Sequence, residues 1–173
     1  MFFFFILLIA FVFFLDEVTD VVHSFLNREE IVDMENVSSG RLRCELSRTT
    51  ENLNLEVIAN FDFVDRGLIS LEQETTHTGE ATVDTTRITE LREQCFYLRD
   101  NILEVDGINV VCNTGSNSVM RMTETFQFEL IDPSQISAAY AEAGGTLPEF
   151  TLNQDISRIR ESMERAGYTC ELL

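Results

Sequence analysis

The sequence has no lysine, no tryptophan and only two histidines, and all 12 of its basic residues are arginine. The absence of lysine excludes Schiff-base catalysis and the lysine of a phosphate-binding P-loop. We expect His23 on a solvated N-terminal segment and His77 in a polar loop, both outside the core. The sequence therefore offers little imidazole for general-base catalysis or for a metal site.

The common catalytic and ligand-binding motifs are missing as well. The chain contains no G-x-S-x-G, G-x-G-x-x-G, P-loop, H-E-x-x-H or EF-hand pattern. Two pairs of acids share one side of an expected element, Glu72 with Glu74 and Glu161 with Glu164, and both patterns are typical of solvated faces. We therefore expect no catalytic residue, no metal ligand and no cofactor, and the sequence does not indicate an enzyme.

The chain is strongly acidic, with 30 acidic residues and a formal net charge of −18. Such a surface repels phosphate backbones and anionic lipid headgroups. Nucleic acid is therefore not an expected partner.

Four cysteines are present, Cys44, Cys95, Cys112 and Cys170, and their spacing matches no CxxC zinc or redox motif. Each lies on or beside an expected core element, and their even number favours two disulfides in an oxidising compartment. Four buried, reduced thiols in a cytosolic protein are the alternative.

The first 15 residues carry no polar side chain, and seven of the first 14 are phenylalanine. As a helix they would span about 22 Å, less than the roughly 30 Å hydrocarbon core, although Val18, Val21, Val22 and Phe25 extend the apolar stripe. A cleaved signal peptide would need a charged start and a small-residue cleavage site. A buried core helix is a third possibility, and an uncleaved membrane anchor fits best.

This pattern divides the chain into three parts. Residues 1–26 form a hydrophobic anchor or signal segment that continues into a stalk helix, and through them we expect contact with the membrane. Residues 27–40 form an acidic stalk and a linker that ends in Ser38-Ser39-Gly40. Residues 41–173 form an extracytoplasmic α+β domain closed by disulfides.

Alternating apolar and polar residues predict the strands of this domain. The clearest is 53–63, and 41–47 precedes it. A hairpin turn at 65–67 leads to a strand over 68–75, which is followed by a polar loop over 76–84. The later strands are 108–112 and 119–131. Glu124 interrupts the apolar row of the last strand, which predicts a bulge or a place at the margin of the sheet.

Three helices are expected in the same domain. Steps of three and four residues mark a central helix from Thr85 or Thr86 to about Ile102, whose stripe includes Cys95. Asp132-Pro133 begins a second helix that Gly144-Gly145 ends. The third steps from Leu152 to Ala166, with Thr151 and Gln154 as a capping box and Gly167 as its stop. The predicted fold is α+β, with β-β-β-α-β-β-α-α order and the helices on one face of an antiparallel sheet.

The pairing of the cysteines follows from this arrangement. Cys95 lies about 10–12 Å from the end of the central helix, and Cys112 lies about 16 Å along the next strand, so the two sulfurs meet if the helix folds back. If the last helix covers the same face, Cys170 reaches Cys44. We therefore predict the disulfides Cys95–Cys112 and Cys44–Cys170. A redox-active Cys95–Cys112 bond is the alternative, although its place on two apolar stripes favours an inert one.

Three short stretches resemble one known family. Arg41-Leu42-Arg43-Cys44 begins the domain, 105–110 reads Val-Asp-Gly-Ile-Asn-Val, and Ala166-Gly167-Tyr168-Thr169-Cys170 ends it. Together they are similar to the YehR-like small lipoproteins of bacteria, especially the cysteine-containing versions from Bacillota. The resemblance covers about residues 41–170 and implies an anchored extracytoplasmic domain of undefined activity. No lipobox cysteine follows the apolar segment, so a helical anchor would replace the lipid.

The expected function is therefore non-catalytic. We expect a binding or structural module of the cell envelope, anchored in the cell membrane with its folded domain outside the cytoplasm. A pilin-like assembly subunit is one alternative, since an apolar N-terminal helix precedes an amphipathic stalk. A receptor for a small ligand or a cation, bound between sheet and helices, is another.

Overall fold

The computed structural model describes residues 37–50, 53–79, 85–103, 105–132, 140 and 150–173. The expected N-terminal anchor and stalk and nearly all of the helix predicted after Pro133 lie outside these residues. Within them, two helices, α2 (Thr85–Ile102) and α4 (Ile156–Arg165), accompany six strands. The strands are β1 (Gly40–Thr49), β2 (Leu53–Val64), β3 (Gly67–Gly79), β4 (Ile108–Ser116), β5 (Val119–Gln127) and β6 (Thr169–Leu172).

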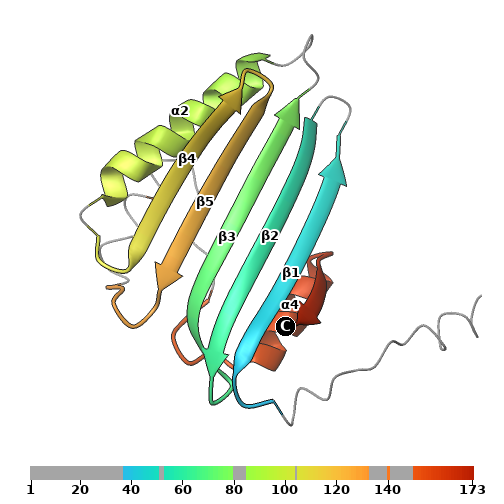
Figure 1. Cartoon of the computed structure of the whole chain (residues 1–173), viewed down its shortest axis with the longest axis vertical. Helices are drawn as coiled ribbons and strands as arrows, with labels where there is room; N and C mark the ends of the chain where they lie inside the picture. The colour runs from blue at the N-terminus through green and yellow to red at the C-terminus, as the bar shows by residue number, and fades with distance from the viewer. Residues whose placement is uncertain (1–36, 51–52, 80–84, 104, 133–139, 141–149) are drawn as a thin grey trace, which may run out of the picture. The chain divides into compact units, whose positions relative to one another are not determined.

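All six strands form one antiparallel sheet in the order β4-β5-β3-β2-β1-β6 (Figure 1). β2 lies near its centre, and the side chains that alternate along β2 are buried on one face, as the sequence pattern predicts. Phe61 of β2 faces Leu42 on one neighbouring strand and Leu71 on the other, and none of the three is exposed. This row of apolar side chains is the middle of the core.

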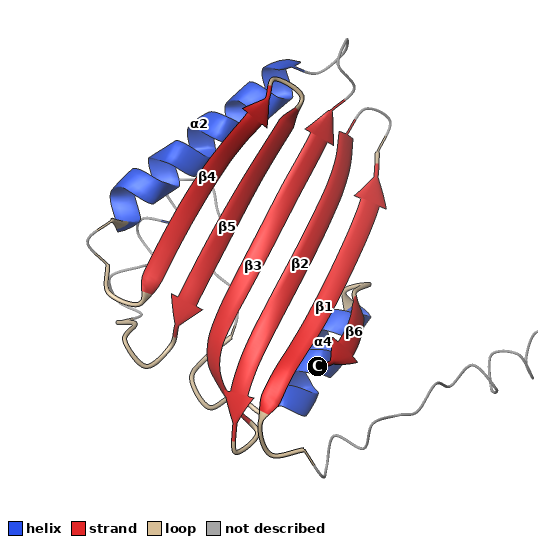
Figure 2. Cartoon of the chain, in the orientation of Figure 1, coloured by secondary structure: helices blue, strands red, loops and turns tan. Residues whose placement is uncertain are grey.

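Both helices cover this apolar face of the sheet (Figure 2). α2 packs on β4, β5 and β3, and α4 packs on β1 and β6. On the same face, the ring of Phe150 meets Phe61 edge to face, with ring centroids 5.1 Å apart, and the ring centroids of Tyr140 and Phe126 lie 6.3 Å apart. The α+β class and the position of the helices on one face of an antiparallel sheet are therefore confirmed.

The opposite face of the sheet is polar, and its arginines are paired with acids. Arg41 donates to Asp62 at 2.7 Å, and Arg43 donates to Glu45 at 2.6 Å. Arg121 of β5 lies 3.4 Å from a carboxylate oxygen of Glu74 on the neighbouring strand β3. All three pairs are at least partly exposed, so they contribute little to stability.

The predicted turn between β2 and β3 is confirmed as a two-residue hairpin. Asp65 and Arg66 both have positive φ, 50° and 66°, which is the backbone of a type I′ turn. This turn is the usual one between twisted antiparallel strands, but it is normally made by Asn and Gly. Backbone bonds hold Arg66 in place, since its N–H donates to Ser38 and its carbonyl accepts from Ile156.

Apart from the ends of β4 and β5, which lie at Ser116 and Gln127 rather than at 112 and 131, three details differ from the sequence prediction. β3 continues to Gly79, so the residues predicted as a loop from Thr76 are paired with β2 and β5. Residues 169–172 form a sixth strand beside β1, where only a short terminal segment was expected. The last described element is therefore a strand rather than the predicted helix.

The third difference is the start of the last helix. Asp155 is the N-cap, and its side chain accepts a hydrogen bond from the N–H of Ser157. The predicted helix start at Thr151 is wrong, because Asn153 has a φ of 61° and no helix runs through it. One hydrogen bond of the predicted capping box is nevertheless present, since the N–H of Thr151 donates to Gln154 Oε1 at 3.1 Å. Leu152 is consequently 40% exposed instead of packed in the core.

Candidate functional site

The first disulfide joins neighbouring strands at one edge of the sheet. Cys44 of β1 and Cys170 of β6 are direct partners in the antiparallel register, and their Cα atoms lie 4.1 Å apart. Cys44 is fully buried. The bond attaches a four-residue strand, 126 positions away in sequence, to the beginning of the domain. The predicted pairing is confirmed, although the partner of Cys44 lies on a strand rather than on a tail.

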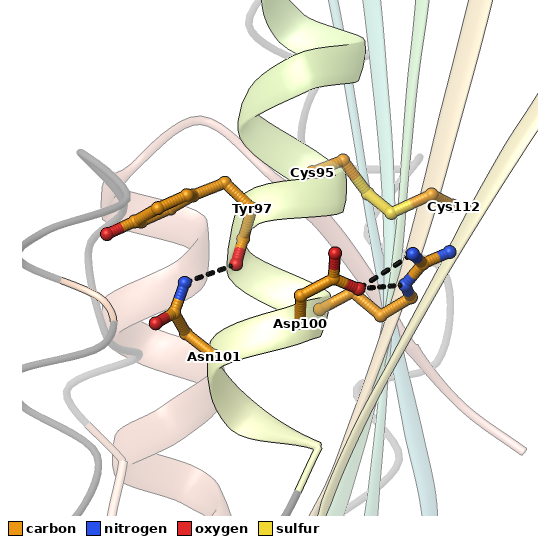
Figure 3. Close-up of polar contacts among 6 residues, drawn as sticks. Cys95, Tyr97, Asp100, Asn101 and Cys112 are labelled. Carbon is orange, nitrogen blue, oxygen red and sulfur yellow. Dashed lines mark hydrogen bonds and ion pairs between the residues drawn. A yellow bond between two sulfur atoms is a disulfide. The ribbon is translucent and has the colours of Figure 1, made fainter.

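The second disulfide fixes a helix to the opposite edge of the sheet (Figure 3). Cys95 of α2 is bonded to Cys112 of β4, with 6.0 Å between their Cα atoms, which confirms this pairing too. Figure 3 shows Tyr97 on the side of the helix turned away from the sulfurs. Cys95 is only 2% exposed, so this side of the bond is shielded from attack by a thiol in solution.

A carboxyl group is buried on the helix-covered face in the middle of β5. Glu124 is 6% exposed, and it is paired in register with Gln73 of β3 and Val110 of β4. The expectation of a bulge or a sheet margin at Glu124 is wrong, because β5 lies between two strands and its register is continuous there.

The hydroxyl of Tyr140 explains how this acid is tolerated. It donates to Glu124 Oε1 at 2.9 Å, and the tyrosine itself is 2% exposed. Burial raises the pKa of Glu124, and the hydrogen bond from Tyr140 only partly opposes this shift. The pKa of Tyr140 is raised by burial and by the nearby carboxylate. A pair of groups that favours the neutral form of a carboxyl is often found at functional sites, but structural pairs show it too.

His77 lies in strand β3 and not in a loop. It is half-buried, and its Nδ1 is buried without a hydrogen-bond partner. Burial lowers the pKa of His77, and the positive charge of Arg87 lowers it further. The histidine is therefore neutral at pH 7. The prediction of a loop failed because the threonines around it look polar in sequence, while Thr75 and Thr76 are buried in the sheet.

A shallow groove of about 530 Å³ lies where the β2–β3 hairpin meets the start of α4. Arg66 binds across it, donating to Asp155 Oδ2 at 3.3 Å and to Ser157 Oγ at 3.0 Å. Burial raises the pKa of Asp155, but the bonds from Arg66 and Ser157 outweigh burial and lower it overall. The charged groups of the groove therefore join hairpin and helix. Sequence reasoning missed this junction, because nothing in the pattern relates positions 89 residues apart.

The described part of the chain holds no cluster of three or more histidine, cysteine or acidic side chains that could bind a metal ion. Within that same part, neither helix has both the length and the apolar character needed to cross a membrane. The candidate features are therefore the two disulfides, the buried Glu124–Tyr140 pair and the hairpin groove.

Together these features define a two-layer α+β domain that is closed by a disulfide at each edge of its sheet. Comparison with solved structures finds the same fold in two proteins studied by NMR. The first is a protein from Streptococcus pneumoniae TIGR4, with a TM-score of 0.54 and 14% identity, over 79% of this chain and 87% of that one. The second is the E. coli protein YehR, with a TM-score of 0.53 and 11% identity, over 79% of this chain and 95% of that one.

These similarities support the YehR-like fold that the sequence resemblance predicts. At such low identity they establish the fold alone. No protein family defined by a sequence profile matches the chain, and no curated protein matches it significantly.

Proposed function

We propose that this chain is an envelope protein related to the YehR-like lipoproteins, anchored in the cell membrane through residues 1–26. Its disulfide-closed domain lies outside the cytoplasm and acts as a non-catalytic binding or structural module. The pairing of all four cysteines is the observation that carries this proposal. Structural disulfides form and persist in oxidising compartments and are rare where glutathione keeps thiols reduced.

The position of the disulfides gives further support. One bond attaches the last strand to the first, and the other attaches α2 to the edge strand β4. Each joins two different elements of the fold, and such crosslinks stabilise domains outside the cell chiefly by restricting the unfolded chain.

A topology reporter tests the proposal. Alkaline phosphatase is active only where its own disulfides form, so its fusion after Leu173 should be active in a bacterial host when residues 1–26 are present. The same fusion without residues 1–26 is the control and should be inactive. An inactive full-length fusion that is nevertheless stable and abundant would place the domain in the cytoplasm and overturn the proposal.

A further inference from the structure

Exposed apolar side chains gather at one end of the sheet. Among the described residues, seven large apolar side chains are exposed. Four of them, Val64, Leu103, Leu130 and Leu152, come from four separate segments and are between 40% and 78% exposed. Single exposed apolar residues are normal on any protein, so the informative observation is that these four share one end.

Backbone hydrogen bonds place Val64 and Leu152 together at this end. Val64 is the last residue of β2, immediately before the hairpin turn. The N–H of Asn153 donates to the carbonyl of Leu68, and the N–H of Leu68 donates to the carbonyl of Gln154, so residues 151–155 lie against the start of β3.

The other two residues lie at the same end, beside β4 and β5. Leu103 follows α2, and Leu130 follows β5, whose last residue Gln127 donates to the carbonyl of Gly107 at 2.7 Å. The N–H of Phe128 donates to the carbonyl of Ile69, near the start of β3. This bond connects the segment after β5 to the β2–β3 hairpin. Figure 1 shows the hairpin, the start of β4 and the end of β5 at this one end of the sheet. We call the four side chains the apolar end.

The chain enters the described domain at the same end. Ser38 accepts a hydrogen bond from the N–H of Arg66 at the hairpin, and Gly40 is paired with Phe63. Only ten residues, 27–36, separate this entry from the proposed anchor. Even when fully extended they span at most about 35 Å. An anchor in residues 1–26 would therefore keep the point where the chain enters the domain, and with it the apolar end, within about 35 Å of the membrane.

We propose that the apolar end rests on the lipid surface, with Val64, Leu103, Leu130 and Leu152 inserted among uncharged or zwitterionic headgroups. This inference depends on the anchoring proposed above. Exposed acids flank the four side chains, including Asp65, Asp106 and Glu129, and they oppose contact with anionic lipids. Each insertion is weak by itself, but the tether gives the domain a high effective concentration at the surface.

Single-tryptophan fluorescence tests this contact, because the protein contains no tryptophan. Leu130→Trp and Leu152→Trp, each in the full chain, report from the apolar end. Thr114→Trp is the matched control, since Thr114 is exposed on β4 about 20 Å from Ile108, beside the hairpin at the far end of the sheet. The proteins are reconstituted into phosphatidylcholine vesicles whose acyl chains are brominated and quench nearby tryptophan.

We expect at least twofold quenching of Leu130→Trp and Leu152→Trp and little quenching of Thr114→Trp. Replacing part of the phosphatidylcholine by phosphatidylglycerol should reduce the quenching at the apolar end. Equal quenching at all three positions, or none at any, overturns the contact, and an increase with phosphatidylglycerol overturns the preference for an uncharged surface. Flotation of the vesicles is measured first. A chain that fails to float with them contradicts the anchor itself, whereas a chain that floats without quenching contradicts only the contact.

Discussion

Glu124 is a carboxyl group in the interior of the domain, and its protonation contributes to the pH dependence of stability. Its pKa is raised above the ordinary value of 4.5 because burial disfavours the charged form. The folded protein therefore holds this proton more tightly than the unfolded chain does. As the pH rises from about 4.5 through the folded pKa, the contribution of Glu124 to the free energy of unfolding becomes less favourable.

Replacing this acid should accordingly stabilise the protein in a pH-dependent way. Glu124→Gln keeps an oxygen that can accept from Tyr140 but cannot ionise. We expect the variant to be more stable than the wild type by about 1–3 kcal/mol at pH 8, with the difference decreasing towards pH 4. Urea denaturation at both pH values measures it. An equal shift at pH 4 and pH 8 would show that packing, and not charge, is responsible.

Tyr140→Phe is the complementary change, since it removes the hydroxyl that donates to Glu124 while keeping the ring near Phe126. It should lower the free energy of unfolding by about 1–3 kcal/mol at pH 8. The same change should cost less at pH 4, or in a chain that already carries Glu124→Gln. A cost independent of both conditions would contradict a role for the hydrogen bond to the carboxylate.

A second test concerns Gly107, in the turn before β4, where a side chain should destabilise the fold. Its φ is +81°, and an added Cβ would lie 2.8 Å from the carbonyl oxygen of Gln127 and 2.9 Å from Leu130 Cβ. Gly107→Ala should therefore destabilise the protein by about 1–3 kcal/mol. Gly115→Ala is the matched control, because nothing lies within 4 Å of its added Cβ, and it should change stability by less than about 0.5 kcal/mol. Thermal unfolding that ranks the two variants alike would refute this account.

At the scale of elements, long regular patterns were predictable. The alternation in β2 and the stripe of α2 identify buried faces because each repeats over several periods. Both cysteine pairs could be predicted because the cysteines lie on or beside such buried faces. β6 was missed because four residues are too short to show a period. The end of β3 was missed because its threonines and His77 are polar, although threonine is favoured in strands.

The contacts of the candidate site were less predictable for a different reason. Glu124 and Tyr140 belong to separate elements, as do Arg66 and Asp155, and no local pattern connects their positions. The start of α4 depends on the positive φ of Asn153, which tertiary contacts with Gly67 and Leu68 impose. Such contacts form only when the sheet is assembled, so the spacing of apolar residues in the sequence does not reveal them.

The two disulfides should contribute unequally to the stability of these elements. Removing Cys95–Cys112 by a double substitution to alanine opens a loop with a sequence separation of 17, which corresponds to about 3 kcal/mol. Removing Cys44–Cys170 opens one with a separation of 126, and we expect a loss of about 4–5 kcal/mol, as an upper figure. Urea denaturation of both double variants gives the comparison. A larger loss for the shorter loop would contradict stabilisation through the unfolded chain.

At the scale of the whole molecule, the fold, the oxidised cysteines and the proposed anchor form one account. The sheet brings its apolar face under two helices and leaves a polar face exposed. The disulfides close both edges, and the chain enters at the end where exposed apolar residues gather. The two disulfides of this account require a compartment in which thiols oxidise.

Peptide mapping of the protein taken directly from cells is the most direct measurement of that requirement. Trypsin cleaves after arginine, and the 12 arginines place the cysteines in four different peptides, 44–48, 93–99, 100–121 and 166–173. With free thiols blocked at lysis and no reductant, we predict the linked pairs 44–48 with 166–173 and 93–99 with 100–121, and no blocked cysteine. Blocked thiols at all four positions would contradict an oxidised domain outside the cytoplasm, and peptides linked in any other combination would contradict the pairing that the fold requires.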